Sequence, residues 1–317
     1  MKKVLLFGDP GIDDAIGIIY ALLHPQIDLI GVVTGYGNVD EKQATANASY
    51  LLQLAGRPDI PVIRGATGPF SGEVVTYYPE IHGEDGLGPI RPPENLVTNV
   101  QRFSAVHELI DKHKGDLSIV DTGRTTSLAV SFILSGAELL QSVKEIYLMG
   151  GAFNYPGNVT AVAEANFHGD PIATDLVLEK GKNISIIPLN ITNRAIVTPQ
   201  MIDTIAAYQS NPFSSLIKPI IDFYNEAYKD LIPGLNGSPM HDSVTLFAMM
   251  SPQYFQFISR RVRVDTSELS RGRTIADFRV KPDDEPPETL ERIAVDFNYQ
   301  AFANDFMNIM TRRILRY

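Results

Sequence analysis

The chain of 317 residues has a globular composition, with 44% hydrophobic residues, 20% charged residues and a formal net charge of -10. This balance excludes a disordered or fibrous protein, and the acidic charge argues against a nucleic-acid partner, which would require clustered Lys and Arg. No apolar run approaches a membrane span, and without Cys any metal must be held by oxygen or imidazole. We therefore expect a soluble cytoplasmic protein that binds small neutral molecules.

Strand and helix patterns alternate along the first two thirds of the chain. The strand patterns cover residues 4–7, 27–34, 61–63, 117–121, 145–149 and 184–189. The helical patterns cover residues 12–23, 41–55, 103–114, 125–140, 171–180 and 213–230. This alternation predicts an α/β fold with a mostly parallel central sheet and helices on both faces, in a single domain over residues 1–317.

The C-terminal part of the chain has a different pattern. Residues 256–264 and 274–280 have the β-rich alternation of a small hairpin or of paired edge strands, and residues 299–315 predict a closing amphipathic helix. The Pro-rich stretch 281–288 predicts a loop. Residues 66–100 and 230–240 are long loops that could form the rim or lid of a site.

Three carboxylates lie where the first predicted strand meets the first helix, in the run Asp9-Pro10-Gly11-Ile12-Asp13-Asp14. Open α/β sheets bind their ligands at this position. Helix capping explains one or two of these Asp residues, because a helix N-terminus favours negative charge. Three carboxylates in six residues repel one another unless a cation compensates, which favours a hard, oxygen-seeking ion such as Ca²⁺.

This run, continued by Ala15, resembles the aspartate-rich N-terminal fingerprint of the inosine-uridine-type nucleoside hydrolases. Further matching segments follow in the family's order: Gly37-Asn38-Val39, residues 81–88, Met149-Gly150-Gly151-Ala152, Gly157-Asn158, Ala163-Glu164-Ala165-Asn166, Asp170-Pro171 and Met240-His241-Asp242. The resemblance runs from residue 4 to about residue 250. It implies the Rossmann-like fold of that family and the hydrolysis of a ribonucleoside to free base and ribose.

The family's site residues carry over where this sequence matches. The resemblance implies a Ca²⁺ held by Asp9, Asp14, Asp242 and the backbone carbonyl of Thr126. Asp9 would also accept the proton of the attacking water, and His241 would protonate the departing base. The residues expected to bind substrate are Asp13 and Asn38 on the ribose 2′ side, Asn158, Glu164 and Asn166 at the 5′ and 3′ hydroxyls, and His82, Tyr224 and Tyr228. Carboxylate and amide oxygens suit this reaction, because positive charge develops on the ribose as the bond breaks.

Each of these residues also has an ordinary structural interpretation. The alternatives are turn residues for Asn158 and Asn166, a solvated charge for Glu164, an exposed loop residue for His82, a helix start for Met240-His241-Asp242, and core packing for Tyr224 and Tyr228. For the tyrosines, core packing is the preferred interpretation. For the others, their joint occurrence in the family's order favours the functional interpretation.

Three segments depart from the family pattern. Phe7 stands where the family usually has one more Asp, two residues before the Asp-Pro-Gly, so a carboxylate beside the metal is missing. The segment 123–127 reads Gly-Arg-Thr-Thr-Ser in place of the more usual Gly-Pro-Leu-Thr-Asn, and its Arg124 could alter the loop. Ala165 stands where the family often has Phe, which leaves more room beside the ribose motif. All direct ligands that the resemblance implies are retained.

The first functional hypothesis is Ca²⁺-dependent hydrolysis of purine or pyrimidine ribonucleosides for nucleoside salvage, by a homodimer or homotetramer as the resemblance suggests. The second is a nucleoside-binding or sensor protein that has lost most turnover through Phe7. An α/β phosphatase is a weaker reading, because Gly11 occupies the position where that class expects a second Asp. A nicotinamide enzyme is weaker still, since Gly35-Tyr36-Gly37 lacks the third glycine of a dinucleotide-binding loop. Base preference is left open.

Overall fold

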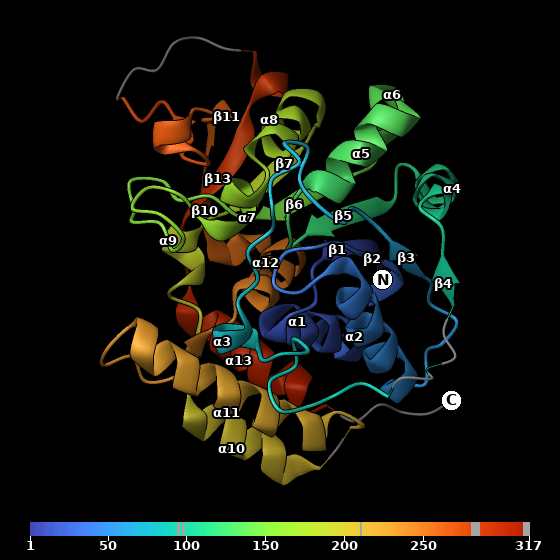
Figure 1. The fold of residues 1–317 in the computed structure, drawn as a ribbon, viewed down its shortest axis with the longest axis vertical. Helices are drawn as coiled ribbons and strands as arrows, with labels where there is room; N and C mark the ends of the chain where they lie inside the picture. The colour runs from blue at the N-terminus through green and yellow to red at the C-terminus, as the bar shows by residue number, and fades with distance from the viewer. Residues whose placement is uncertain (94–95, 97–98, 210, 280–285, 313–317) are drawn as a thin grey trace.

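The centre of the molecule is a nine-stranded sheet (Figure 1), seen in a computed structural model that describes residues 1–93, 96, 99–209, 211–279 and 286–312. The strand order is β10-β13-β7-β6-β5-β1-β2-β3-β4. The strands are β1 Lys2–Gly8, β2 Ile27–Thr34, β3 Val62–Arg64, β4 Val100–Gln101, β5 Leu117–Asp121, β6 Glu145–Met149, β7 Ile184–Ile187, β10 Phe255–Arg260 and β13 Glu291–Phe297. Only the β10–β13 pair is antiparallel among the described strands of this sheet.

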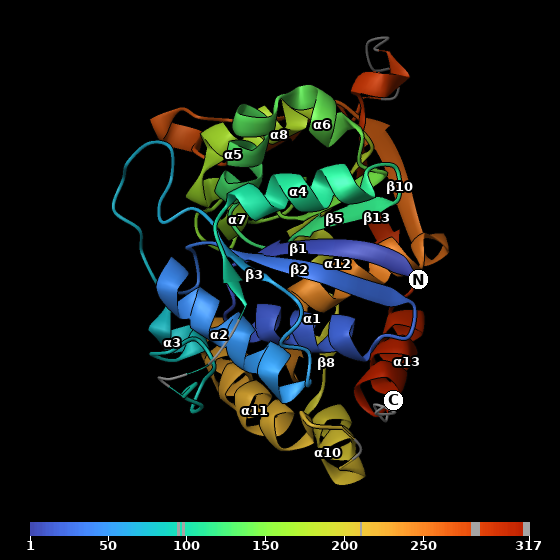
Figure 2. The same ribbon diagram turned by 90° about the vertical axis from the view of Figure 1, so that its right-hand side faces the viewer.

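Helices cover both faces of the sheet (Figure 2). One face carries α4 Ser104–His113, α5 Thr126–Ser135, α6 Ala137–Gln141 and α8 Pro171–Lys180. The other carries α1 Ile12–Leu23, α2 Glu41–Leu54, α10 Pro199–Tyr208, α11 Ser214–Leu231, α12 His241–Met250 and α13 Tyr299–Met310. The short helices are α3 Pro79–His82, α7 Ala165–Gly169 and α9 Leu189–Thr192. In the part of the chain that the structure describes, every helix is too short or too polar to cross a bilayer.

Two cores lie on opposite sides of the sheet, and β1 contributes to both. Side chains alternate between the faces of a strand, so Val4 and Leu6 join the core beneath α1 and α12, whereas Leu5 and Phe7 join the core beneath α5 and α8. Strands buried on both faces in this way are typical of parallel sheets. The predicted fold class is therefore confirmed, and the central strands are packed on both faces.

The C-terminal prediction is only partly right. The small hairpin exists, as β11 Val262–Val264 paired with β12 Thr274–Ala276. The first part of the predicted strand 256–264, however, is β10, which pairs with β13 at the edge of the main sheet. The strand β13 was not predicted from the sequence, and the loop predicted just before it covers residues 281–288, most of which lie outside the described residues. The last residues of the predicted helix 299–315 lie outside them too.

Two other element boundaries differ from the prediction. The helix expected over residues 125–140 is divided into α5 and α6 at Gly136, whose φ of +75° ends the first helix. The strand expected over residues 184–189 ends at Ile187, because Leu189 begins α9. A second short antiparallel pair, β8 Ile196–Val197 with β9 Ser238–Pro239, precedes α12 and fixes where that helix begins.

Candidate active site

A cavity of about 320 Å³ opens at the carboxyl edge of the sheet. Its floor includes Asp13, Asn38 and Thr122. One wall comes from the segment around α7, with Asn158, Glu164 and Asn166, and the opposite wall from α3, α11 and α12, with His82, Tyr224, Tyr228 and His241. The elements that the sequence placed far apart thus meet around one space, as open α/β sheets allow at the ends of their strands.

Three carboxylates meet at the floor. Asp13 and Asp14 lie in the first turn of α1 and Asp242 lies in the first turn of α12. One oxygen from each falls within 4.8 Å of the others, and all three side chains are buried. The N-termini of two helices therefore point at the same spot, where their dipoles favour negative charge. Asp13, expected only on the ribose, belongs to this cluster as well.

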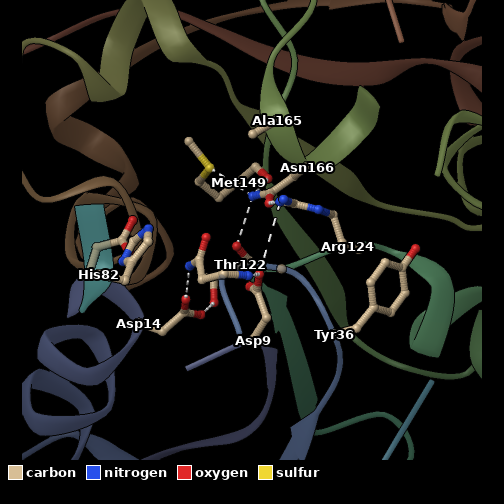
Figure 3. Close-up of polar contacts among 12 residues, drawn as sticks. Asp9, Asp14, Tyr36, His82, Thr122, Arg124, Met149, Ala165 and Asn166 are labelled. Atoms are coloured by element: carbon tan, nitrogen blue, oxygen red, sulfur yellow. Dashed lines mark hydrogen bonds and ion pairs between the residues drawn. The ribbon is translucent and has the colours of Figure 1, made fainter. Parts of the chain in front are cut away.

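Asp9 follows β1 directly and is tied to the same cluster by Asn38. The backbone N–H of Asn38 donates to Asp9 Oδ2 at 2.6 Å, and its side-chain Nδ2 donates to Asp14 Oδ2 at 3.0 Å. Gly37 is required here, because a Cβ at that position would lie 1.7 Å from Asp9 Oδ2. Asn38 thus holds two of the expected ligands in fixed positions, and Thr122 Oγ1 holds Asp14 from the other side at 2.8 Å (Figure 3).

The acids of the floor are not satisfied by the protein alone. Among the described residues, Asp9 Oδ1, Asp13 Oδ1 and Asp242 Oδ2 are buried and have no hydrogen-bond partner. Burial raises the pKa of Asp9 and of Asp13 to about 7, and it raises the pKa of Asp14 and Asp242 well above the ordinary range. Each unpartnered buried acceptor costs about 1–3 kcal/mol. A hard cation would relieve this cost, so the donor set fits one.

The wall around α7, which we call the ribose-side wall after the expectation from the sequence, is built around Glu164 and Asn166. The Glu164 carboxylate accepts from the backbone N–H groups of Asn166 at 2.8 Å and Gly151 at 2.9 Å, and it caps α7. Asn166 Nδ2 donates to the carbonyl of Thr122 at 2.8 Å. Asn158 is exposed, and its Oδ1 accepts from the N–H of Ala165 at 2.9 Å. Glu164 is 2% exposed, so it is not a solvated surface charge.

The opposite wall, which we call the base-side wall after the expectation from the sequence, is aromatic and internally hydrogen bonded. His241 lies between Tyr228 Oη, 2.9 Å from its Nε2, and Thr192 Oγ1, 2.7 Å from its Nδ1. The Nδ1 of His82 accepts from the backbone N–H of Ile12 at 3.1 Å. Burial lowers the pKa of His241 to about 4 and that of His82 to about 3, so both are neutral near pH 7. Tyr224 is buried beside Tyr228, with 4.8 Å between ring centroids.

The structure does not bring Thr126 to the acid cluster. Thr126 begins α5, where its carbonyl belongs to the helical ladder, and its hydroxyl donates to Asp170 Oδ2 at 2.8 Å. Thr122, four residues earlier at the end of β5, lines the cavity and contacts Asp14. Thr122, and not Thr126, therefore lies at the strand end where open α/β sheets bind their ligands.

Arg124 is a site residue that the sequence analysis did not place. Its side chain reaches into the cavity, where Nη1 donates to Asn166 Oδ1 at 2.5 Å and lies 4.0 Å from Asp9 Oδ2 (Figure 3). Its guanidinium lowers the pKa of Asp9 and of Glu164, partly opposing the effect of their burial. The departure from the family at position 124 was visible in the sequence, but the direction of the side chain was not.

Comparison with known proteins adds to this geometry. The family described as inosine-uridine preferring nucleoside hydrolase matches residues 4–304. The chain belongs to this family. A uridine nucleosidase from Arabidopsis thaliana is 32% identical over 88% of this chain and 83% of its own length. A pyrimidine-specific ribonucleoside hydrolase from Shigella boydii is 32% identical over 95% of this chain and 96% of its own.

The solved structures similar to this nucleoside hydrolase agree with it in fold. A purine-preferring ribonucleoside hydrolase from Gardnerella vaginalis superimposes with a TM-score of 0.90 at 29% identity, covering 98% of both chains. A plant nucleoside hydrolase gives a TM-score of 0.89 at 30% identity, covering 98% of this chain and 99% of its own. The resemblance seen in the sequence motifs is confirmed over almost the whole chain, including the C-terminal part where the motifs were less distinct.

Proposed function

We propose that this nucleoside hydrolase cleaves the N-glycosidic bond of purine or pyrimidine ribonucleosides in a Ca²⁺-dependent reaction, and that it serves nucleoside salvage. The observation that carries the proposal is the set of buried carboxylate oxygens without partners beside the amide and carboxylate groups of the ribose-side wall. A site with oxygen donors only suits a hard cation. The names of its relatives include both purines and pyrimidines, so the proposal covers ribonucleosides as a class.

The cation would be held by Asp9, Asp14 and Asp242, with the carbonyl of Thr122 in place of that of Thr126. Asp13 lies in the same acid cluster, where it would face both the ion and the ribose. When bound, Ca²⁺ would lower the pKa of a water molecule and orient the ribose hydroxyls. The three unpartnered oxygens of Asp9, Asp13 and Asp242 support this assignment.

The other steps of the reaction would be carried out by side chains of the protein. Asp9 Oδ1, which has no partner among the described residues, would accept the proton of the attacking water. Asp13 and Asn38 would bind the 2′ side of the ribose, and Asn158, Glu164 and Asn166 would bind the 5′ and 3′ hydroxyls. Because these groups are negative or carry oxygen dipoles, they would also stabilise the positive charge that develops on the sugar.

The departing base would meet the aromatic wall. His241 would protonate it, and the hydroxyl of Tyr228, 2.9 Å from His241 Nε2, would connect this imidazole to the cavity. Because burial lowers the pKa of His241 to about 4, its minor protonated, imidazolium form would act as the acid. It would give its proton to the departing base, and the neutral imidazole that remains, held by Tyr228 and Thr192, would take up a proton from solvent before the next turnover. Tyr224, Tyr228 and His82 would contact the base, because all three line the cavity on this side.

Inosine, guanosine, adenosine, uridine and cytidine, assayed with and without a Ca²⁺ chelator, test the proposal. Release of free base and reducing sugar from at least one nucleoside, lost with the chelator and restored by added Ca²⁺, is the expected result. Turnover that survives chelation would refute the metal. No turnover of any nucleoside, with binding retained, would instead support the nucleoside-binding or sensor protein.

The assembly and compartment belong to the proposal as well. From the family resemblance we propose a homodimer or homotetramer in the cytoplasm, with no nucleic-acid or membrane partner. The net charge of -10 supports the absence of a nucleic-acid partner, because phosphate backbones bind basic surfaces. Light scattering of the purified protein measures the oligomeric state, and a monomeric mass would contradict this part.

A further inference from the structure

Phe7 stands at the end of β1 where the family resemblance expects a carboxylate, and a carboxylate lies next to it on β5. In the parallel β1–β5 pair, Phe7 is the register partner of Asp121. Partners in adjacent strands point to the same face, and Leu5 and Phe7 share their core with Leu117 and Ile119 of β5. An Asp at position 7 and the Asp at position 121 would therefore project from the same side of the sheet, one strand apart.

Asp121 has the properties of a group that a site uses. It is 1% exposed at the carboxyl end of β5. Its Oδ1 accepts from the backbone N–H of Gly123 at 3.2 Å, whereas its Oδ2 is buried and has no hydrogen-bond partner among the described residues. Since a buried acceptor left unpaired is costly, a purely structural role in a hydrophobic core does not explain an Asp here.

The residues that follow Asp121 connect it to the proposed cation ligands. A Cβ at Gly123, whose N–H binds Asp121, would lie 2.6 Å from Asp9 Oδ1, so this glycine fits between the two acids. Thr122 donates its hydroxyl to Asp14 Oδ1 at 2.8 Å.

Arg124 offers a rival explanation, in which Asp121 is simply its counterion. The contacts of Arg124 go elsewhere, because its Nη1 donates to Asn166 and lies 4.0 Å from Asp9. The Oδ1 of Asp121 accepts from the Gly123 N–H and its Oδ2 has no hydrogen-bond partner among the described residues, so Arg124 does not pair with this carboxylate. Arg124 instead adds positive charge beside Asp9, which makes an extra carboxylate near the ligands more necessary for holding a cation.

We propose that Asp121 is a positioning residue of the cation site and supplies, from β5, the carboxylate that β1 lacks at Phe7. Its charge adds to that of Asp9 and Asp14, and its bond to Gly123 fixes the loop against which Asp9 packs. This inference rests on the proposed cation site. The proposed role of Asp121 explains how the chain keeps the negative charge of the site although Phe7 replaces one Asp of the first motif.

Calorimetric Ca²⁺ titration of five proteins tests the proposal: wild type, D121N, F7D/D121N, the matched control F7N/D121N and the further control D170N. Groups behind the direct ligands commonly contribute about 10–100-fold in metal affinity, so D121N should bind Ca²⁺ weaker by that factor. F7D/D121N, which returns the carboxylate to β1, should recover most of the affinity. F7N/D121N has the same change of size without the charge and should stay weak. D170N, which removes another buried carboxylate outside the acid cluster, should bind like wild type.

Each of the following results would contradict one part of this proposal. Equal affinities of D121N and wild type overturn the role of Asp121, as does a D121N variant whose ion-free melting temperature falls while its Ca²⁺ affinity stays. A weak F7D/D121N variant, no tighter than F7N/D121N, overturns the exchange between strands. If wild type itself binds no Ca²⁺, the cation site of the proposed function fails and this inference fails with it.

Discussion

The floor of the cavity and its base-side wall differ in whether their polar groups have hydrogen-bond partners within the protein. The floor gathers Asp9, Asp13 and Asp242 with oxygens that no described residue satisfies, so it is incomplete without a ligand. The base-side wall is complete in itself, because both nitrogens of His241 have partners in Tyr228 and Thr192. The difference indicates that changes on the floor affect every substrate, whereas changes on the base-side wall depend on the leaving group.

Burial acts on both regions but in opposite directions. It raises the pKa of Asp9 and Asp13 and lowers the pKa of His82 and His241, so in each case the neutral form is favoured. A bound cation would reverse the effect on the floor, because it stabilises ionised carboxylates. It would not do so for the histidines. The two regions are thus expected to respond differently to Ca²⁺ and to pH.

The largest expected effect is at the floor. Asp9→Asn keeps the shape but removes the charge and the base, and it should lower kcat/KM by about 10⁴-fold, the upper end for a lost general base. The loss should be equal for inosine and for a nitrophenyl riboside, because the floor serves the ribose and the attacking water in both. A variant with more than a tenth of wild-type activity would remove Asp9 from the mechanism.

The base-side wall should give a smaller and substrate-dependent effect. His241→Ala should slow inosine or uridine cleavage about 10²–10³-fold, because general-acid assistance is worth about 10²–10⁴-fold. A nitrophenyl leaving group departs without a proton, so the same variant should lose much less activity on that riboside. Equal losses on both substrates would assign His241 to structure or ribose binding. If neither substrate is affected, His82 is the next residue to test.

The 5′ end of the ribose gives the smallest effect of the three. Uridine should exceed uridine 5′-monophosphate in kcat/KM by about 100-fold, because the buried Glu164 carboxylate repels a phosphate in a site of low dielectric. Arg124, the cation nearest to this wall, is already engaged by Asn166 and Asp9. Glu164→Gln should narrow the ratio. Similar kcat/KM values for uridine and uridine 5′-monophosphate would show that Glu164 does not exclude a phosphate at the 5′ end.

The sequence predicted the elements whose signals are local. The run from Asp9 to Asp14 marks a strand end and a helix start by its own residues, and the structure has both there. The strand β13 could not be found in this way, because it pairs with β10, more than thirty residues away, and periodicity does not reveal partners. Nothing in the sequence showed that residues 256–264 divide between two sheets.

The prediction of individual site residues was limited in the same way. The order of the family motifs along the chain predicted Asp14, Glu164 and Asn166 as site residues. In the structure Glu164 and Asn166 line one cavity, and Asp14 lies directly behind its lining, bonded to Asn38. The motif order led to Thr126 and away from Thr122, although the predicted strand 117–121 ends where β5 does, because the role followed the family motif at residues 123–127 and not the end of the strand. The motif order gave no role to Asp121, because the role we propose depends on the strand register that places Asp121 opposite Phe7.

The central claim is that the floor is built for a cation, and Ca²⁺ titration of the wild-type protein at pH 6 and pH 8 tests it most directly. Without the ion the pKa of Asp9 and Asp13 is about 7, so both are largely protonated at pH 6 and ionised at pH 8. Because binding requires the ionised form, affinity should rise as pH rises through 7, by about tenfold or more, with protons released at pH 6. No Ca²⁺ binding at either pH, together with nucleoside cleavage in the presence of a chelator, would contradict the claim.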